Sequence, residues 1–104
     1  MKYAYHDLGH QDAGTAVTVR LNGSACNVFL TDQRNFSQYR AGLPFRYSGG
    51  HAFRTPVELE VPEAGHWYVV VDLGGYPGRV RGTVDVRPAE GRRRSERHGS
   101  LVTA

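Results

Sequence analysis

The sequence predicts an all-β protein, an antiparallel β-sandwich with jelly-roll-like topology, seven to eight strands and one short helical segment. Apolar and polar residues alternate with a period of two through several short, valine-rich runs, which is the pattern of half-buried strands. Turn-forming Gly, Pro and Asn residues separate these runs at intervals of about 8–12 residues, a spacing typical of sandwiches and barrels. No segment is long enough for the crossover helix of a parallel sheet, so we expect antiparallel pairing. A partly open barrel is the alternative.

The first two long β patterns lie in the N-terminal third of the chain. A short strand is expected at residues 2–6, KYAYH, before a turn at Gly9. Residues 15–21, TAVTVRL, place their valines on one side. The Asn-Gly pair at residues 22–23 is a preferred type I′ hairpin turn. We therefore expect a hairpin that joins this strand to residues 25–31, ACNVFLT.

Residues 32–41, DQRNFSQYRA, break the alternation and predict a short helix over one end of the sheet. The Asp32 carboxylate can accept hydrogen bonds from the first helical N–H groups as an N-cap. Phe36 and Tyr39 are three residues apart and therefore share a helical face. Gly42 is suited to ending the helix, because glycine tolerates the left-handed backbone conformation found there.

The stretch after the helix, residues 43–55, is rich in aromatic residues. We interpret it as two short strands around a turn at Gly49-Gly50. Pro44 is expected at the mouth of the first of these strands, where its missing N–H is tolerated.

The last strands have the clearest alternation. Residues 57–61, VELEV, and residues 79–86, RVRGTVDV, each predict one apolar and one polar face. Residues 66–73, HWYVVVDL, are nearly apolar on both faces and predict a central strand. The turns between them are expected at residues 62–65 and 74–78. The inward positions are expected to be Val57, Leu59, Val61, Trp67, Val69, Val71, Leu73, Val80, Gly82, Val84 and Val86.

The positive charge of the chain is concentrated at its C-terminal end. Residues 1–87 carry nine basic and eight acidic side chains, whereas residues 88–104 carry four arginines and two glutamates. The latter segment also lacks apolar periodicity, so we expect a single domain at 1–87 and a disordered basic tail at 88–104. The run Arg92–Arg94 could make weak contacts with nucleic acid, but a nearly neutral domain argues against nucleic acid as a main partner.

Other features of composition indicate a cytoplasmic protein without membrane contacts. The only cysteine, Cys26, excludes an internal disulfide and fits a reducing compartment. No run of about 18 apolar residues could cross a membrane, and the N-terminus lacks the apolar region of a secretory signal. Monomer and dimer are not distinguished by the sequence.

Catalytic and metal-binding patterns are weak. His6 and His10 are four residues apart, but on a strand this spacing does not bring two imidazoles together. His51 and His66 lie next to glycines at predicted strand starts. A zinc site needs three or four converging ligands, and nothing in the spacing of the histidines indicates such a set. We therefore expect no enzyme, no metal and no cofactor. The alternative is a metal-dependent or hydrolytic enzyme that uses His6, His10, His51 or His66 together with Asp7 or Asp72.

Aromatic residues are more informative, because six Tyr, four Phe and one Trp are many for a domain of this size. Several fall near predicted turns, where binding residues concentrate on rigid scaffolds. They could form a recognition surface together with nearby arginines, or cap the ends of the sandwich, and Trp67 could belong to the core. The residues expected to form a ligand-binding site are Asn35, Tyr39, Arg40, Tyr47, His51, Trp67 and Tyr76.

Four segments carry a resemblance to a known family. They are KYAYHDLGH, SACNVFLTDQRNFSQYRAG, YSGGH and GHWYVVVDLGGYPGRVRGTVDV, in this order over residues 1–87. Together they resemble a bacterial family known as domain of unknown function 1883. The resemblance implies a β-sandwich that occurs alone or beside signalling domains, and an accessory or sensing module with no catalytic residues to carry over. The function expected is a small binding module that recognises a ligand or a protein partner, such as a signalling protein, through loops at one end of the sandwich.

Overall fold

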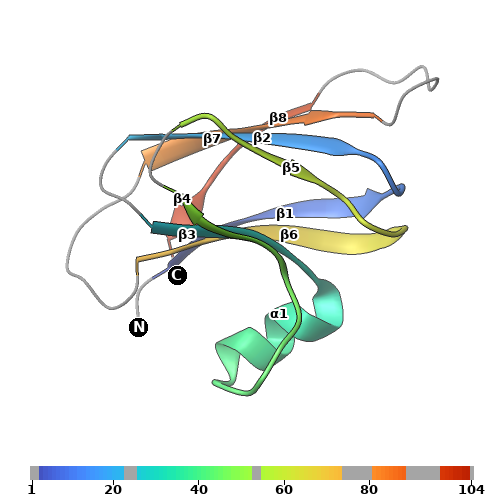
Figure 1. Ribbon diagram of the computed structural model, residues 1–104, viewed down its shortest axis with the longest axis vertical. Helices are drawn as coiled ribbons and strands as arrows, with labels where there is room; N and C mark the ends of the chain where they lie inside the picture. Colours follow the sequence, from blue (N-terminus) through green and yellow to red (C-terminus); the bar gives the residue numbers. More distant parts are fainter. Residues whose placement is uncertain (1–2, 23–25, 53–54, 74–80, 89–96, 104) are drawn as a thin grey trace.

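The computed structural model describes residues 3–22, 26–52, 55–73, 81–88 and 97–103. Two antiparallel sheets pack face to face, and one helix lies outside them (Figure 1). The predicted all-β sandwich is therefore confirmed. No helix among the described residues is long and apolar enough to cross a membrane.

Each sheet combines strands from distant parts of the chain, and every pairing is antiparallel. The five-stranded sheet has the order β4 (Ser48–Ala52), β3 (Cys26–Asp32), β6 (Gly65–Asp72), β1 (Tyr3–Gln11) and β9 (Val102–Thr103). The four-stranded sheet has the order β5 (Val57–Glu60), β2 (Ala16–Asn22), β7 (Arg81–Arg87) and β8 (Arg97–Ser100).

Connections that cross between the sheets dominate the topology from β1 to β7. In this part of the chain, β3 and β4 are the one pair of consecutive described strands that share a sheet, and α1 lies between them. The strands β7 and β8, further along, also share a sheet. The predicted hairpin at the Asn-Gly pair is wrong, because β2 and β3 belong to different sheets. Both strands have one apolar face, and these faces meet across the sandwich instead of lying side by side. Residues 23–25, where the turn was expected, lie outside the described residues.

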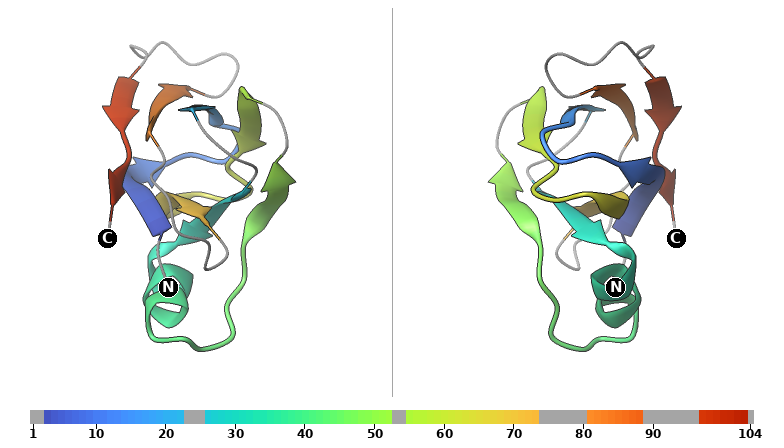
Figure 2. Two further views of the ribbon diagram at one scale, coloured as in Figure 1. Left: turned by 90° about the vertical axis from the view of Figure 1, so that its left-hand side faces the viewer. Right: turned by 90° about the vertical axis from the view of Figure 1, so that its right-hand side faces the viewer.

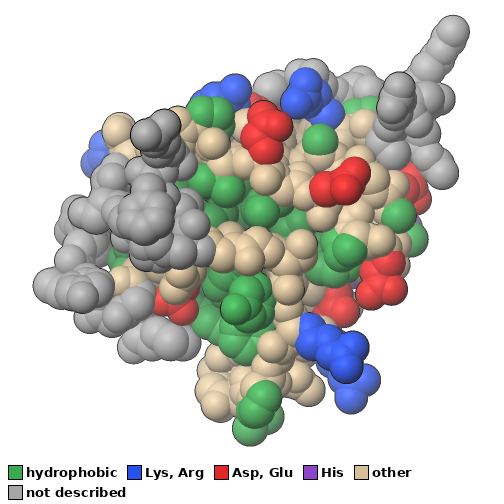
Figure 3. Space-filling view, in the orientation of Figure 1, with side chains coloured by type: hydrophobic (Ala, Val, Ile, Leu, Met, Phe, Trp, Pro, Cys, Tyr) green, Lys and Arg blue, Asp and Glu red, His purple; other side chains and the backbone are tan. Residues whose placement is uncertain are grey.

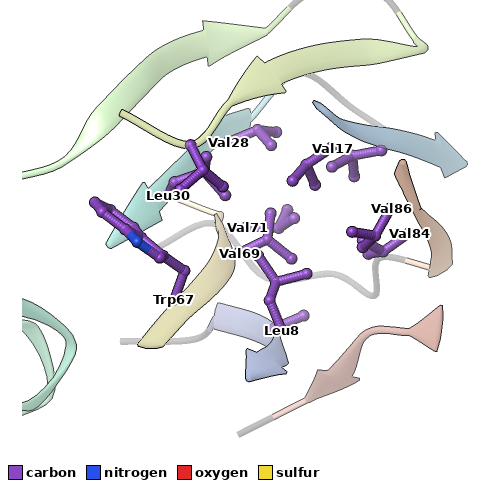
Figure 4. Packing of buried hydrophobic residues seen from close by; sticks show 12 residues of the cluster. Leu8, Val17, Val28, Leu30, Trp67, Val69, Val71, Val84 and Val86 are labelled. Atoms are coloured by element: carbon purple, nitrogen blue, oxygen red, sulfur yellow. The ribbon is translucent and has the colours of Figure 1, made fainter. Parts of the chain in front are cut away.

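The core lies between the two sheets (Figure 4). Val17 and Val84 of the four-stranded sheet and Val28 and Val69 of the five-stranded sheet are all fully buried in one cluster, and Leu59 packs against it. These five residues from both sheets therefore share a common interior. Burying each such side chain stabilises the fold by about 1.5–3 kcal/mol.

The strand β6 is central in its sheet, as predicted, because it pairs with both β1 and β3. Its outward residue Val70 is as fully buried as its inward residue Val69. Val70 is covered by a second cluster of buried side chains, which lies on the face of the sheet that points away from the core between the sheets. We call it the outer cluster. The outer cluster comprises Tyr3, Phe29, Phe36, Tyr39 and Val70.

The helix α1 (Gln33–Arg40) supplies two members of the outer cluster, Phe36 and Tyr39. As predicted, the side chain of Asp32 caps it, accepting a hydrogen bond from the N–H of Asn35 at 2.8 Å. The helix packs against β3 and β6 on the outer face of the sheet (Figures 1 and 2). It therefore covers the sheet's face, and the predicted position over the sheet's end is wrong.

The segment after the helix contains one strand where two were expected. Gly49 and Gly50 lie within β4, and residues 43–47, including Pro44, form no regular structure. Gly49 has a φ of +129°, and a Cβ there would lie 2.5 Å from the carbonyl oxygen of Val28. This glycine therefore permits a close approach of β4 to β3, and does not form a turn.

The strand β1 is longer than expected, because it continues through Gly9 to Gln11. The register with β6 shifts between Asp7 and Gly9, so a β-bulge replaces the predicted turn. The extra residue, Leu8, is buried in the core. Gly9 has a φ of +68°, and its N–H donates to Asp7 Oδ1 at 2.8 Å.

Part of the segment expected to be a disordered tail contributes strands. Residues 97–103 form β8 and β9, which extend the two sheets along the same side of the sandwich (Figure 2). Residues 89–96 lie outside the described residues, as does the predicted turn at residues 74–78. The domain boundary at residue 87 stays a prediction.

Candidate binding surface

Residues 43–47 form the loop from α1 to β4, and we call them the 43–47 loop. The loop is attached to the helix at both of its ends. The Leu43 N–H donates to the carbonyl oxygen of Gln38 at 2.9 Å. The Arg46 N–H donates to Asn35 Oδ1 at 2.7 Å. These bonds hold the loop in place without a strand partner.

Aromatic rings fix the loop against the outer face of the sheet. Phe45 lies 5.1 Å from Tyr39 and 5.6 Å from Phe29, measured between ring centroids. Tyr47 lies 5.2 Å from Phe29. Yet Tyr47 remains 57% exposed, and Leu43 remains 56% exposed. The loop is therefore anchored by some of its apolar surface while presenting the rest to solvent.

Two hollows flank this loop, and Phe45 and Tyr47 line both of them. The first hollow, on the side of the β5–β6 turn, has a volume of about 660 Å³. The second hollow, over β3 and the end of α1, has a volume of about 490 Å³. The space-filling view of this face shows a hydrophobic patch above the helix, with charged side chains to either side (Figure 3).

The first hollow has a mixed polar lining that includes Arg34, Arg46 and Glu63. Asn35 and Asp32 also line it, but their polar groups already bind each other: Asn35 Nδ2 donates to Asp32 Oδ1 at 2.9 Å. The other polar residues of this lining are Arg34, Gln38, Arg46, Ser48 and Glu63.

Trp67 contributes to the first hollow only at its margin. Its side chain is 5% exposed and belongs to the core cluster, and its indole N–H donates to the carbonyl oxygen of Glu63 at 2.8 Å. Most of the Trp67 side chain is therefore part of the core, which was the alternative to a place in the binding site.

The second hollow is lined in part by four aromatic side chains, those of Phe29, Tyr39, Phe45 and Tyr47, and contains one strong polar pair. The Tyr39 hydroxyl donates to Asp72 Oδ2 at 2.6 Å. Burial, together with the Asp72 carboxylate, raises the pKa of Tyr39 well above its ordinary value. The hydroxyl therefore stays protonated and keeps donating to the carboxylate at neutral pH.

The structure gathers four of the seven predicted site residues around the 43–47 loop. Asn35, Tyr47 and Trp67 line the first hollow, and Tyr39 joins Tyr47 at the second. Arg40 lies elsewhere on α1, with its guanidinium carbon 5.5 Å from the centre of the Phe36 ring. The side chain of His51, on β4, and the whole of Tyr76 lie outside the described residues.

Leu43, Phe45 and Glu63 also line these hollows, although they were not among the site residues expected from the sequence. Leu43 and Phe45 were expected at the start of a strand, where residues two apart share one face. The signal that could have identified them is Pro44 between them, because proline disfavours a strand interior. Glu63 was interpreted only as part of a turn.

A separate polar pair lies on the same outer face, outside both hollows. His66 Nε2 lies 2.6 Å from Asp7 Oδ1. The imidazole stacks on Tyr68 at 5.1 Å between centroids, and Tyr68 stacks on Phe36 at 4.2 Å. Burial, followed by the Asp7 carboxylate, raises the pKa of Tyr68. Two neighbouring rings thus already stack on Tyr68.

Of the other histidines, the structure describes the side chains of His6 and His10. His10 is mostly exposed, with its Nε2 3.9 Å from Asp12 Oδ1. His6 lies against Gly99 of β8. Within the part of the chain that the structure describes, no three His, Cys, Asp or Glu side chains are placed to hold a metal ion. The expectation that the protein is not an enzyme stays a prediction, as does the enzymatic alternative.

The fold and this surface define a class: a small antiparallel β-sandwich domain with a helix on one outer face and an aromatic loop between two hollows. Residues 1–90 match the family described as a domain of unknown function, DUF1883. The chain belongs to this family, and the resemblance inferred from its sequence is confirmed. Neither the curated proteins nor the solved structures gave a match to the chain.

Proposed function

We propose that the domain is a protein-interaction module, and that an extended peptide segment of a partner protein binds across the 43–47 loop. One observation carries the proposal. Among the described residues, the large hydrophobic side chains that are exposed are Leu43 and Tyr47, and both belong to this loop. Exposed apolar side chains that gather in one place mark interaction sites more often than scattered ones do.

The two hollows suit neighbouring side chains of different character. Their volumes, about 660 and 490 Å³, fall within the usual range of about 300–1,000 Å³ for binding pockets. The aromatic second hollow suits an apolar or aromatic side chain. The first hollow, with Arg34, Arg46 and Glu63, suits a polar or charged one. A peptide with an apolar residue close to a polar residue would therefore occupy both.

The loop is also preorganised, which favours binding. The bond from Arg46 to Asn35 and the ring contacts of Phe45 and Tyr47 hold it in one conformation. A rigid surface loses little conformational entropy when a ligand docks on it. An exposed tyrosine is also among the side chains that most often dominate an interface.

A selection from a displayed library of random peptides, with the full chain as target, tests the proposal. Selected peptides are expected to lose about tenfold or more in affinity towards a Tyr47→Ala variant, as for a central interface residue. The matched control is Thr83→Ala, an exposed position on β7 of the other sheet, which should leave the affinity unchanged.

Two outcomes would count against the proposal. One is a selection that yields no binding peptide. The other is a set of peptides that bind the Tyr47→Ala variant as tightly as the natural chain. Since the Tyr47 side chain is more than half exposed, the variant is expected to fold, and its circular dichroism spectrum checks this.

A further inference from the structure

Residues 97–103 run along the side of the sandwich opposite to the edges formed by β4 and β5 (Figure 2). β8 pairs with residues 83–86 of β7, and β9 pairs with residues 4–5 of β1. A single short segment thus supplies the last strand of both sheets. Without it, β1 and β7 would both present unpaired backbone N–H and C=O groups at an edge.

The segment and the edge fit each other reciprocally. A Cβ at Gly82 on β7 would lie 2.7 Å from both the Arg20 carbonyl oxygen and Leu21 Cδ2 on β2, and 2.9 Å from Leu101 Cδ1, so the glycine leaves room for the leucine as well as for β2. A Cβ at Gly99 on β8 would overlap the imidazole of His6 on β1, so this second glycine makes room for the histidine. Each partner therefore has a glycine where the other inserts a side chain.

Leu101 also connects the segment to the interior. It packs, partly buried, against the core cluster, and its N–H lies 3.4 Å from the carbonyl oxygen of Gly82. The buried members of the core cluster, by contrast, all lie between residues 4 and 86. The match to the family likewise ends at residue 90, before β8 begins. The segment is thus an addition to a core that the preceding residues already form.

We propose that the edge formed by β1 and β7 is a second interaction site, separate from the 43–47 loop, and that its ligand is the chain's own segment 97–103. The segment binds by strand addition. Its recognition elements are a glycine opposite His6 and, two positions later, an aliphatic side chain opposite Gly82. An identical segment from a second copy of the chain carries the same elements and is accepted at the same site.

The test uses the full chain with a protease cleavage site introduced between residues 89 and 96, which changes none of the contacts described above. After cleavage under native conditions, a fluorescent peptide with the sequence of residues 97–104 is added. The cut chain is expected to exchange its own segment for the peptide. The uncut chain is not, because a tethered segment at an effective concentration on the order of 1 mM outcompetes a free peptide at about 0.05 mM.

A matched peptide separates specific recognition from nonspecific adhesion. The Gly99→Val peptide should bind the cut chain roughly tenfold more weakly or worse, because its side chain meets the His6 ring. A His6→Ala chain should recover part of that loss. Equal binding of both peptides, or no binding of either, would overturn the proposal. Unfolding of the chain on cleavage would overturn it as well, since the segment would then be an integral part of the fold and not a ligand.

Discussion

The hydrogen bond from Tyr39 to Asp72 joins α1 to the central strand β6, and its removal gives a quantitative test of the outer face. The Tyr39 side chain is 4% exposed, and its hydroxyl lies 2.6 Å from Asp72 Oδ2. A Tyr39→Phe substitution deletes this bond and keeps the ring that packs on Tyr3, Phe29 and Phe45.

The size of the effect follows from the charge and the exposure of the acceptor. Hydrogen bonds to charged groups contribute about 1.5–3 kcal/mol. Asp72 is only partly buried, so water can replace the lost donor, and the lower end of this range applies. We expect Tyr39→Phe to lower the free energy of unfolding by about 1.5 kcal/mol and the Tm by roughly 6–12 °C.

Urea unfolding of four proteins measures this contribution: the natural chain, Tyr39→Phe, Asp72→Ala and the double variant. The double-mutant cycle isolates the interaction of this pair from other contacts of Asp72. Tyr47→Phe is the matched control, because it removes a hydroxyl from an exposed ring of the same surface and should change stability by less than about 0.5 kcal/mol. A coupling energy near zero, or a Tyr39→Phe variant as stable as the control, would refute the reasoning.

Three further predictions concern pH, the helix cap and β4. Burial and the nearby carboxylate raise the pKa of Tyr39 in the folded chain, so the unfolded chain loses this proton at a lower pH than the folded chain does. The contribution of the protonated hydroxyl to the free energy of unfolding is therefore complete below pH ~10. Above that pH it falls by up to about 1.4 kcal/mol per pH unit. Urea unfolding at rising pH should show a steeper fall for the natural chain than for Tyr39→Phe, and equal slopes would contradict the assignment. Asp32→Ala removes the N-cap and should cost about 1 kcal/mol, whereas Asp32→Asn should cost much less; thermal unfolding followed by circular dichroism compares them. Gly49→Ala should cost about 2 kcal/mol or more, because its backbone has a φ of +129° and its Cβ would meet the Val28 carbonyl. Gly50→Ala, with nothing within 4 Å of its Cβ, should cost clearly less in the same assay, and equal losses would show that the close approach is not the cause.

Local patterns were sufficient to predict most of the elements of this fold. The alternation in residues 57–61 predicted β5 and its inward side chains, and a cap at Asp32 predicted the start of α1. The nearly continuous apolar run of residues 66–73 predicted that β6 is central. Each of these features depends on neighbours within a few residues, and the sequence shows those neighbours directly.

Strand partners and glycine roles could not be predicted in the same way. The Asn22-Gly23 pair is compatible with a hairpin, but β2 and β3 lie in opposite sheets and bury their apolar faces in one shared core. The Gly49-Gly50 pair has the composition of a turn, yet Gly49 serves a close contact with Val28 on the neighbouring strand. Both outcomes depend on residues that are brought near only by the complete fold.

The same distinction between local patterns and tertiary contacts applies to the candidate binding surface. By itself, the sequence determined the residue types: a domain rich in tyrosine, with Asn35, Tyr39 and Tyr47 near loops. Only the tertiary structure decided which of them meet, because the path from α1 to β4 folds the 43–47 loop back onto Phe29 and separates two hollows with Phe45 and Tyr47. Alternation along a strand fixes which side chains face inward, since the pleat has a period of two. Which outward side chains become neighbours is set by packing between elements distant in the chain, and no local pattern encodes it.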